Sequence, residues 1–122
     1  MNENNLVKRC LIDKDAIETH PFKKDEYSGT IVMRHKSNNK WFALIFELDG
    51  KLCINLKAQP QLLALLREQY DGITPAWHMN KKHWCKIDVN NIPPEVLDEL
   101  IKISFDITAP KRKLKIKDKS DF

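Results

Sequence analysis

The sequence predicts an α+β fold, a two-layer sandwich in which helices pack against an antiparallel sheet. Apolar residues recur with a period of two along residues 30–57 and again along 84–89, as in strands. They recur with helical spacing before residue 20, along 60–70 and after residue 94. The expected order of elements is therefore α-β-β-β-α-β-α, an arrangement typical of the α+β class.

The first predicted helix begins at Asn4 or Asn5, because either side chain can cap a helix. We expect it to end before His20-Pro21, since the residue before a proline is pushed out of the helical region. Its apolar stripe would consist of Leu6, Val7, Cys10 and Leu11.

Three strands are predicted in the middle of the chain. Residues 30–35 alternate, and a polar turn at 37–39 leads into residues 41–48, which are apolar on both faces and so indicate a central strand. Asp49-Gly50 is a dipeptide typical of two-residue hairpins, and residues 52–57 alternate again beyond it.

The second half of the chain predicts a helix, a strand and a helix. Residues 60–70 form the first, with Pro60 in a first turn where its missing N–H costs nothing, and Asp71-Gly72 as its stop. Residues 84–89 alternate as a fourth strand. The last helix starts within residues 91–95, where proline and an acidic residue suit a first turn.

Length and charge predict one domain over residues 1–110, followed by a basic tail over 111–122. A chain of 122 residues with 42% apolar residues can bury a hydrophobic core. The tail holds six of the 21 Lys and Arg residues and two of the 17 acidic ones, so the formal charge of +4 belongs to the tail and the body is neutral. No signal-peptide pattern and no apolar run of about 20 residues is present, so we expect a cytoplasmic protein.

The three cysteines indicate free thiols. Cys10, Cys53 and Cys85 lie far apart and form no CxxC pair, and an odd number cannot be fully paired within one chain. We expect buried thiols. The functional alternative is a reactive Cys85, because Lys86 beside it can lower a thiol pKa.

The segment 77–84, Trp-His-Met-Asn-Lys-Lys-His-Trp, is the strongest candidate for a functional site. It gathers imidazole, amide, ammonium and indole groups where a core segment would alternate. Between Gly72 and Ile87 there are no acidic residues, so the local field is positive. Lys57 precedes a predicted helix start, whose free N–H groups also favour anions. We expect both segments to form one cationic surface.

Several blocks of the sequence, taken together, resemble the MmcQ/YjbR family. They are the strand Phe42-Ala43-Leu44-Ile45, Asn55-Leu56-Lys57 leading to Pro60, the block His78-Met79-Asn80-Lys81-Lys82-His83-Trp84, and Ser104-Phe105 in a final helix. The similarity runs over roughly residues 6–110, and the H-[ML]-N-K-x-H-W block is its most specific part.

The resemblance implies a frataxin-like or secretion-chaperone-like fold and a DNA-binding protein that uses a double-wing surface. Carried over to this chain, it favours Lys57, His78, Asn80, Lys81, His83 and Trp84. A hairpin with Arg34 and Lys40 beside Trp41 would act as a wing, and Lys36 and Lys82 add further phosphate contacts. The expected partner is DNA. The alternative is a protein or a small anionic ligand, bound by a monomer or a weak dimer.

Other chemistries have less support in the sequence. His78 and His83 as zinc ligands would need two more donors, and the spacing matches no known ligand pattern. As a general base, either histidine lacks a nearby nucleophile or paired carboxylate. We therefore predict no catalytic residues, no metal and no cofactor. Two structural alternatives stay open: Lys57 and Lys81 paired with Asp88 or Glu68, and Trp84 packed in the core.

Overall fold

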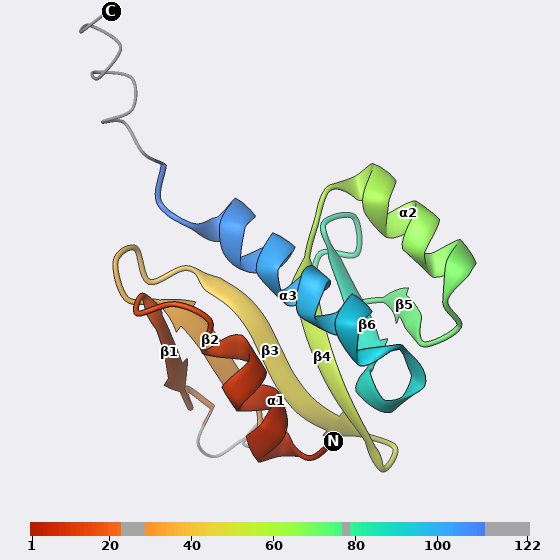
Figure 1. The fold of residues 1–122 in the computed structure, drawn as a ribbon, viewed down its shortest axis with the longest axis horizontal. Helices are drawn as coiled ribbons and strands as arrows, with labels where there is room; N and C mark the ends of the chain where they lie inside the picture. Colours follow the sequence, from red (N-terminus) through yellow and green to blue (C-terminus); the bar gives the residue numbers. More distant parts are fainter. Residues whose placement is uncertain (23–28, 77–78, 112–122) are drawn as a thin grey trace, which may run out of the picture.

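The protein folds into a six-stranded antiparallel sheet with three α-helices, as Figure 1 shows. The computed structural model describes residues 1–22, 29–76 and 79–111. The strands lie in the order β1-β2-β3-β4-β6-β5, and all neighbouring strands run antiparallel. In chain order the elements are α1 (Glu3–Cys10), β1 (Ala16–Thr19), β2 (Ile31–His35), β3 (Trp41–Leu48), β4 (Lys51–Lys57), α2 (Pro60–Gln69), β5 (Ile73–Pro75), β6 (Trp84–Asp88), the 3-10 turn η1 (Val89–Asn91) and α3 (Pro94–Thr108).

The structure confirms the predicted α+β class and corrects the elements near the N-terminus. The first helix ends at Cys10, and residues 16–19 form an edge strand instead of continuing it. Its cap is Asn2, whose side chain accepts a hydrogen bond from the N–H of Asn5 in a capping box, so the helix begins earlier than predicted.

A second edge strand, β5, was also missing from the prediction. It has three residues and ends at Pro75, which an edge position tolerates because no ladder hydrogen bond is needed on the solvent side. The helix before it ends at Gln69. Gly72 does not stop that helix: it allows close approach, since a Cβ at this position would lie 2.8 Å from the carbonyl oxygen of Asn91.

The main core lies between the helices and one face of the sheet. In Figure 1, α1 and α3 cross this face, and alternate residues of the strands meet them. Leu6, Leu63 and Ile101, one from each helix, are fully buried there. Burial of side chains of this size stabilises the fold by roughly 1.5–3 kcal/mol each.

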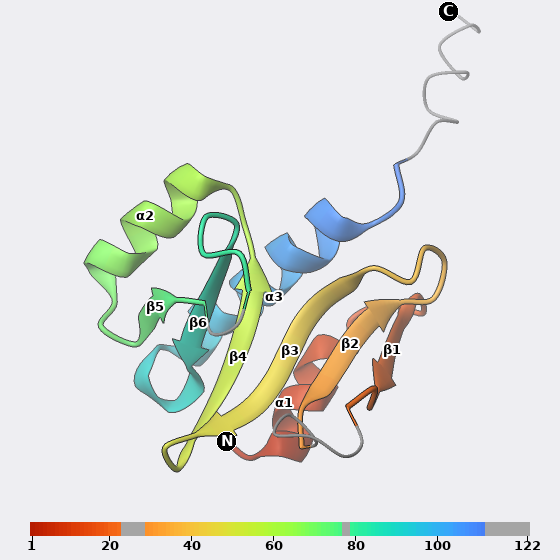
Figure 2. The ribbon, with the colours of Figure 1, turned by 180° about the vertical axis from the view of Figure 1, so that it is seen from behind.

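A smaller core occupies the opposite face, which Figure 2 shows with α1 and α3 behind the sheet. Its buried residues are Val32, Leu44, Phe46, Cys53, Ala76 and Trp84. Phe22 and Met79, which belong to the segments that follow β1 and β5, pack against them. Central strands β3 and β4 are therefore buried on both faces, in agreement with the apolar pattern of residues 41–48.

The turn between β3 and β4 explains the tight register of this hairpin. Asp49 has φ 51° and Gly50 has φ 76°, so both central residues are left-handed. A two-residue turn of this kind matches the right-handed twist of the flanking strands. The ladder continues without a shift from Leu48–Lys51 to Ala43–Leu56.

The part of the chain that the structure describes holds no helix with both the length and the apolar character needed to cross a bilayer.

Candidate functional site

The two lysine-bearing segments singled out in the sequence lie side by side. Lys57, the last residue of β4, pairs with Trp84, the first residue of β6. One residue further on, the N–H of Ala58 donates a 3.0 Å hydrogen bond to the carbonyl of His83. Although Lys57 and the loop before β6 are distant in the sequence, backbone pairing joins the two.

Asn80 organises that loop. Its side-chain oxygen accepts a 2.9 Å hydrogen bond from the N–H of Lys82, and its carbonyl accepts from the N–H groups of His83 and Trp84 at 3.2 and 2.9 Å. The resulting tight turn leaves Lys81 and Lys82 exposed at its tip. The amide that we expected to contact an anion thus also shapes the turn that presents both lysines.

The hairpin between β2 and β3 reaches the same end of the sheet. Neighbouring strands are antiparallel, so one end of the sheet holds the last residues of β2 and β4 together with the first residues of β3 and β6. Lys36 and Lys40 are exposed in this hairpin. In Figure 1 the hairpin, the end of α3 and the β4–α2 junction all lie toward the top of the view. We call Lys36, Lys40, Lys57, Lys81 and Lys82 the cationic end.

The lysines of the cationic end have no acidic partner among the residues that the structure describes. Within the described residues, the ion pairs involve other side chains: Arg9 with Asp98, His20 with Glu18, His35 with Asp15, Lys51 with Asp88 and Lys102 with Asp106. The expected alternative, in which Lys57 or Lys81 pairs with Asp88 or Glu68, is therefore not found. Asp88 pairs instead with Lys51, whose Nζ lies 3.9 Å from its carboxylate oxygen.

Several acidic residues gather at the opposite end of the same strands, whereas Asp15 lies at the cationic end beside the hairpin. Asp49, Asp71 and Asp88 line a cavity of about 200 Å³ there, together with Lys51 and Lys86. Glu47, exposed near the end of β3, adds a further carboxylate. The residues named here carry four carboxylates against two ammonium groups, so this end has an excess of negative charge.

Trp84 does not belong to a binding surface. It is 8% exposed and packs in the smaller core, so its ring cannot stack on a base. This corrects its inclusion among the anion-binding residues and confirms the structural alternative. His83 is half-buried, and the predicted contact His78, together with Trp77, lies outside the described residues.

Trp41 begins β3 beside the hairpin and is also partly covered. The guanidinium of Arg34 lies 5.5 Å from the centre of its ring, and the ring of Phe22 meets it edge-on at 6.0 Å. These contacts fix the base of the hairpin that carries Lys36 and Lys40.

The cysteines are inert by position. All three are free and buried, as expected. Burial raises the pKa of Cys10 to about 12 and that of Cys85 to about 11, and it also raises the pKa of Cys53. A reactive Cys85 is thereby ruled out as an interpretation, because the thiolate is the reactive form. No group of three metal-ligating side chains occurs among the described residues.

Two polar contacts near the cationic end had no signal in the sequence. Ser104 of α3 bonds to the backbone of β3 and β4, and the buried His35 bonds to Asp15 and to the end of α3. Neither pair has a recognisable spacing, because the partners are neighbours only through the fold.

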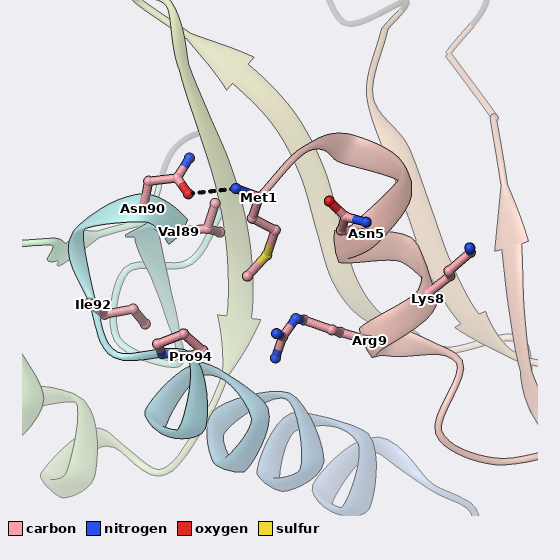
Figure 3. Close-up of a pocket in the computed structure, with 8 residues that line it drawn as sticks. All are labelled: Met1, Asn5, Lys8, Arg9, Val89, Asn90, Ile92 and Pro94. Carbon is pink, nitrogen blue, oxygen red and sulfur yellow. Dashed lines mark hydrogen bonds between the residues drawn. The ribbon is translucent and has the colours of Figure 1, made fainter.

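A cavity of about 690 Å³ lies away from this end, between α1 and the start of α3 (Figure 3). Two of its cations are engaged within the protein: Arg9 binds both oxygens of Asp98 at 2.7 and 2.8 Å, and the N-terminal amine donates to Asn90 at 3.1 Å. In Figure 3, the side chain of Met1 extends into the space. None of the predicted site residues lines it.

Comparison with known proteins identifies the family. The model of the YjbR family matches residues 14–107. The chain belongs to the YjbR family. It is 34% identical to the uncharacterised protein YyaQ of Bacillus subtilis, covering 78% of this chain and 90% of that protein, and 29% identical to the uncharacterised protein YjbR of Escherichia coli K12, covering 78% and 75%.

Solved structures of two bacterial proteins share the fold. A crystal structure of a Pseudomonas syringae protein superposes with a TM-score of 0.79 at 32% identity, over 89% of this chain and all of that one. A Deinococcus radiodurans protein gives 0.75 at 30% identity, over 88% and 78%. The family resemblance noted in the sequence is thus confirmed, while the names of these relatives assign no activity.

Proposed function

We propose that this YjbR-family protein is a non-catalytic DNA-binding protein that contacts phosphates through the cationic end. The observation that carries the proposal is the gathering of five lysines, without acidic partners among the described residues, at one edge of the sheet. Ammonium groups that are not paired within the protein attract phosphate without sequence preference.

The arrangement suits a backbone contact better than base readout. Lys36 and Lys40 stand on one turn, Lys81 and Lys82 on another, and the end of α3 lies between the two turns in Figure 1. Two separated lysine pairs can meet phosphates on either side of a groove. The basic tail starts from the end of α3, so its six cations would add to the same attraction.

The test is fluorescence anisotropy of a labelled duplex, measured between roughly 50 and 200 mM salt. We expect binding that weakens steeply with salt. Lys81→Ala with Lys82→Ala should weaken it and reduce the salt slope by roughly one for each lost phosphate contact. The matched control is Lys51→Ala with Lys86→Ala at the opposite end, which removes the same charge and should change the affinity much less.

Two outcomes would contradict the proposal: no binding at the lowest salt, or equal losses in both double variants. The alternative is a small anionic ligand or a protein partner without nucleic-acid binding. One observation favours it. Helix α2 begins three residues after Lys57, and its cap Gln59 makes no side-chain hydrogen bond to the first turn. The N–H groups of that turn can therefore bind an anion. A thermal-shift screen with phosphates, nucleotides and carboxylates should then show stabilisation that Lys81→Ala removes.

A further inference from the structure

We propose that Arg34 is a preformed receptor for a phosphate group on the outer face of the sheet, the face that carries the smaller core and lies opposite the helices (Figure 2). Arg34 lies within β2, so it belongs neither to the tip of the hairpin nor to the five lysines of the cationic end. The DNA backbone as the source of the phosphate rests on the proposed function, whereas the binding of a phosphate group does not.

A β-bulge brings Arg34 and Trp41 together on the outer face. Met33 pairs with Ala43, whereas Arg34 pairs with Trp41. Strand β3 therefore has one extra residue at this point, Phe42. It packs in the main core, as Ala43 does, and Trp41 turns to the outer face, where it packs against the smaller core. Without the bulge, strict alternation would direct Trp41 to the helix side. Bulges commonly re-aim side chains in this way next to functional sites.

Three neutral groups hold the guanidinium of Arg34 in one orientation. Nε donates a 3.0 Å hydrogen bond to the hydroxyl oxygen of Thr19, whose own proton goes to the carbonyl of Val32 at 2.7 Å. Nη1 donates at 3.2 Å to the side-chain oxygen of Asn39, and Cζ lies over the ring of Trp41, 5.5 Å from its centre. The side chain is thus ordered before a ligand binds, which lowers the entropic cost of binding.

The remaining donors of this guanidinium are available to a ligand. Of its five N–H groups, Thr19 and Asn39 accept from one each, so three are left on Nη1 and Nη2. Nη2 makes no hydrogen bond within the described residues and is open to solvent. The ion pairs in this part of the chain involve other cations, so no carboxylate neutralises Arg34 there. Neighbouring N–H groups of a guanidinium match two oxygens of one phosphate.

A second cation shares this face. Lys57 pairs with Trp84, whose ring packs in the smaller core, and directly paired residues point to the same side of a sheet. Because β3 lies between β2 and β4, the ring of Trp41 separates Arg34 from Lys57. A phosphate chain on the outer face would therefore meet a fixed guanidinium on one side of the ring and a flexible ammonium on the other.

The first test is NMR of the full chain with nitrogen-labelled arginine, titrated with inorganic phosphate. We expect the guanidinium signals of Arg34 to shift more than they do with sodium chloride at the same ionic strength. Arg9 is the internal control, because its guanidinium already binds both oxygens of Asp98. Signals of Arg34 that respond to phosphate no more than those of Arg9 would overturn the proposal without any variant.

The second test identifies the source of the phosphate, through anisotropy of the labelled duplex with Arg34→Lys. Lysine keeps the charge but cannot form two parallel hydrogen bonds, so the affinity should fall roughly tenfold at an unchanged salt slope. Arg9→Lys, the same change at a paired arginine, should bind as the wild type does. Equal affinities in the two variants would overturn the assignment to DNA. A phosphate response in a wild type that binds no duplex would support the receptor and contradict the proposed function.

Discussion

The backbone N–H of Lys57 donates a 2.9 Å hydrogen bond to the side-chain oxygen of Ser104, which in turn donates at 2.6 Å to the carbonyl of Phe42. The regular β3–β4 ladder ends one residue earlier, at Ala43–Leu56. A hydroxyl from α3 is therefore inserted where the next rung would form. This bridge joins the helix, both central strands and the cationic end at one buried point.

Ser104→Ala should lower the free energy of unfolding by about 1–3 kcal/mol, because it leaves a buried N–H and a buried carbonyl without their shared partner. Urea unfolding measures this change. Ser37→Ala, which removes an exposed hydroxyl, should cost less. A Ser104→Ala protein within about 0.5 kcal/mol of the wild type would contradict the bridge.

Truncation of two leucines in α2 should change the stability by very different amounts. Leu63 is fully buried in the main core, whereas Leu65, two residues along the same helix, is 62% exposed. Leu63→Ala should therefore destabilise the protein by about 2–5 kcal/mol, and Leu65→Ala by no more than about 0.5 kcal/mol. Equal effects in thermal or urea unfolding would mean that α2 packs through a different face.

The thiols should be unreactive in the native state. With a pKa of about 11, Cys85 has roughly one thiolate in a thousand at about pH 8, and Cys10, at about 12, has fewer. A colorimetric thiol reagent should modify the native protein slowly and the urea-unfolded protein fast, at all three positions. One rapidly reacting thiol in the native protein would show that burial does not protect it.

Acid should remove the stability that Asp15 contributes. Its pKa in the folded protein lies below the usual value of about 3.9, so its contribution is present above that value and is lost as the pH falls through the folded pKa. The difference in urea midpoint between the wild type and Asp15→Asn should therefore shrink below about pH 4. A difference that stays constant down to strong acid would argue against the hydrogen bonds from Ser37 and His35 to the Asp15 carboxylate.

The elements with many periodic residues could be predicted from the sequence. Strands β2, β3, β4 and β6 and helices α2 and α3 lie where alternation or helical spacing placed them. Strands β1 and β5 could not be predicted, because four and three residues are too few to show a period and both depend on pairing with a neighbour. Because β1 was missed, the end of α1 at Cys10 was missed too, and the helix was expected to continue toward His20.

The candidate site could be predicted only in part. Lys57 lies beside the loop after Asn80 because β4 and β6 are adjacent in the sheet. Lys81 and Lys82 are exposed, whereas Lys57 is half-buried. The position of Trp84 in the smaller core depends on which face of β6 points toward it. His35 and Asp15 were missed because only the fold brings residues twenty positions apart into contact.

The excess of lysines at one end of the strands and of carboxylates at the other gives the domain an electric dipole, even though the formal charges of residues 1–110 sum to zero. Near a polyanion the molecule would turn before it touches, with the edge that carries Lys81 leading and the edge that carries Asp49 trailing. Added salt would screen this attraction at separations beyond about a Debye length, so the molecule would then orient only at shorter range.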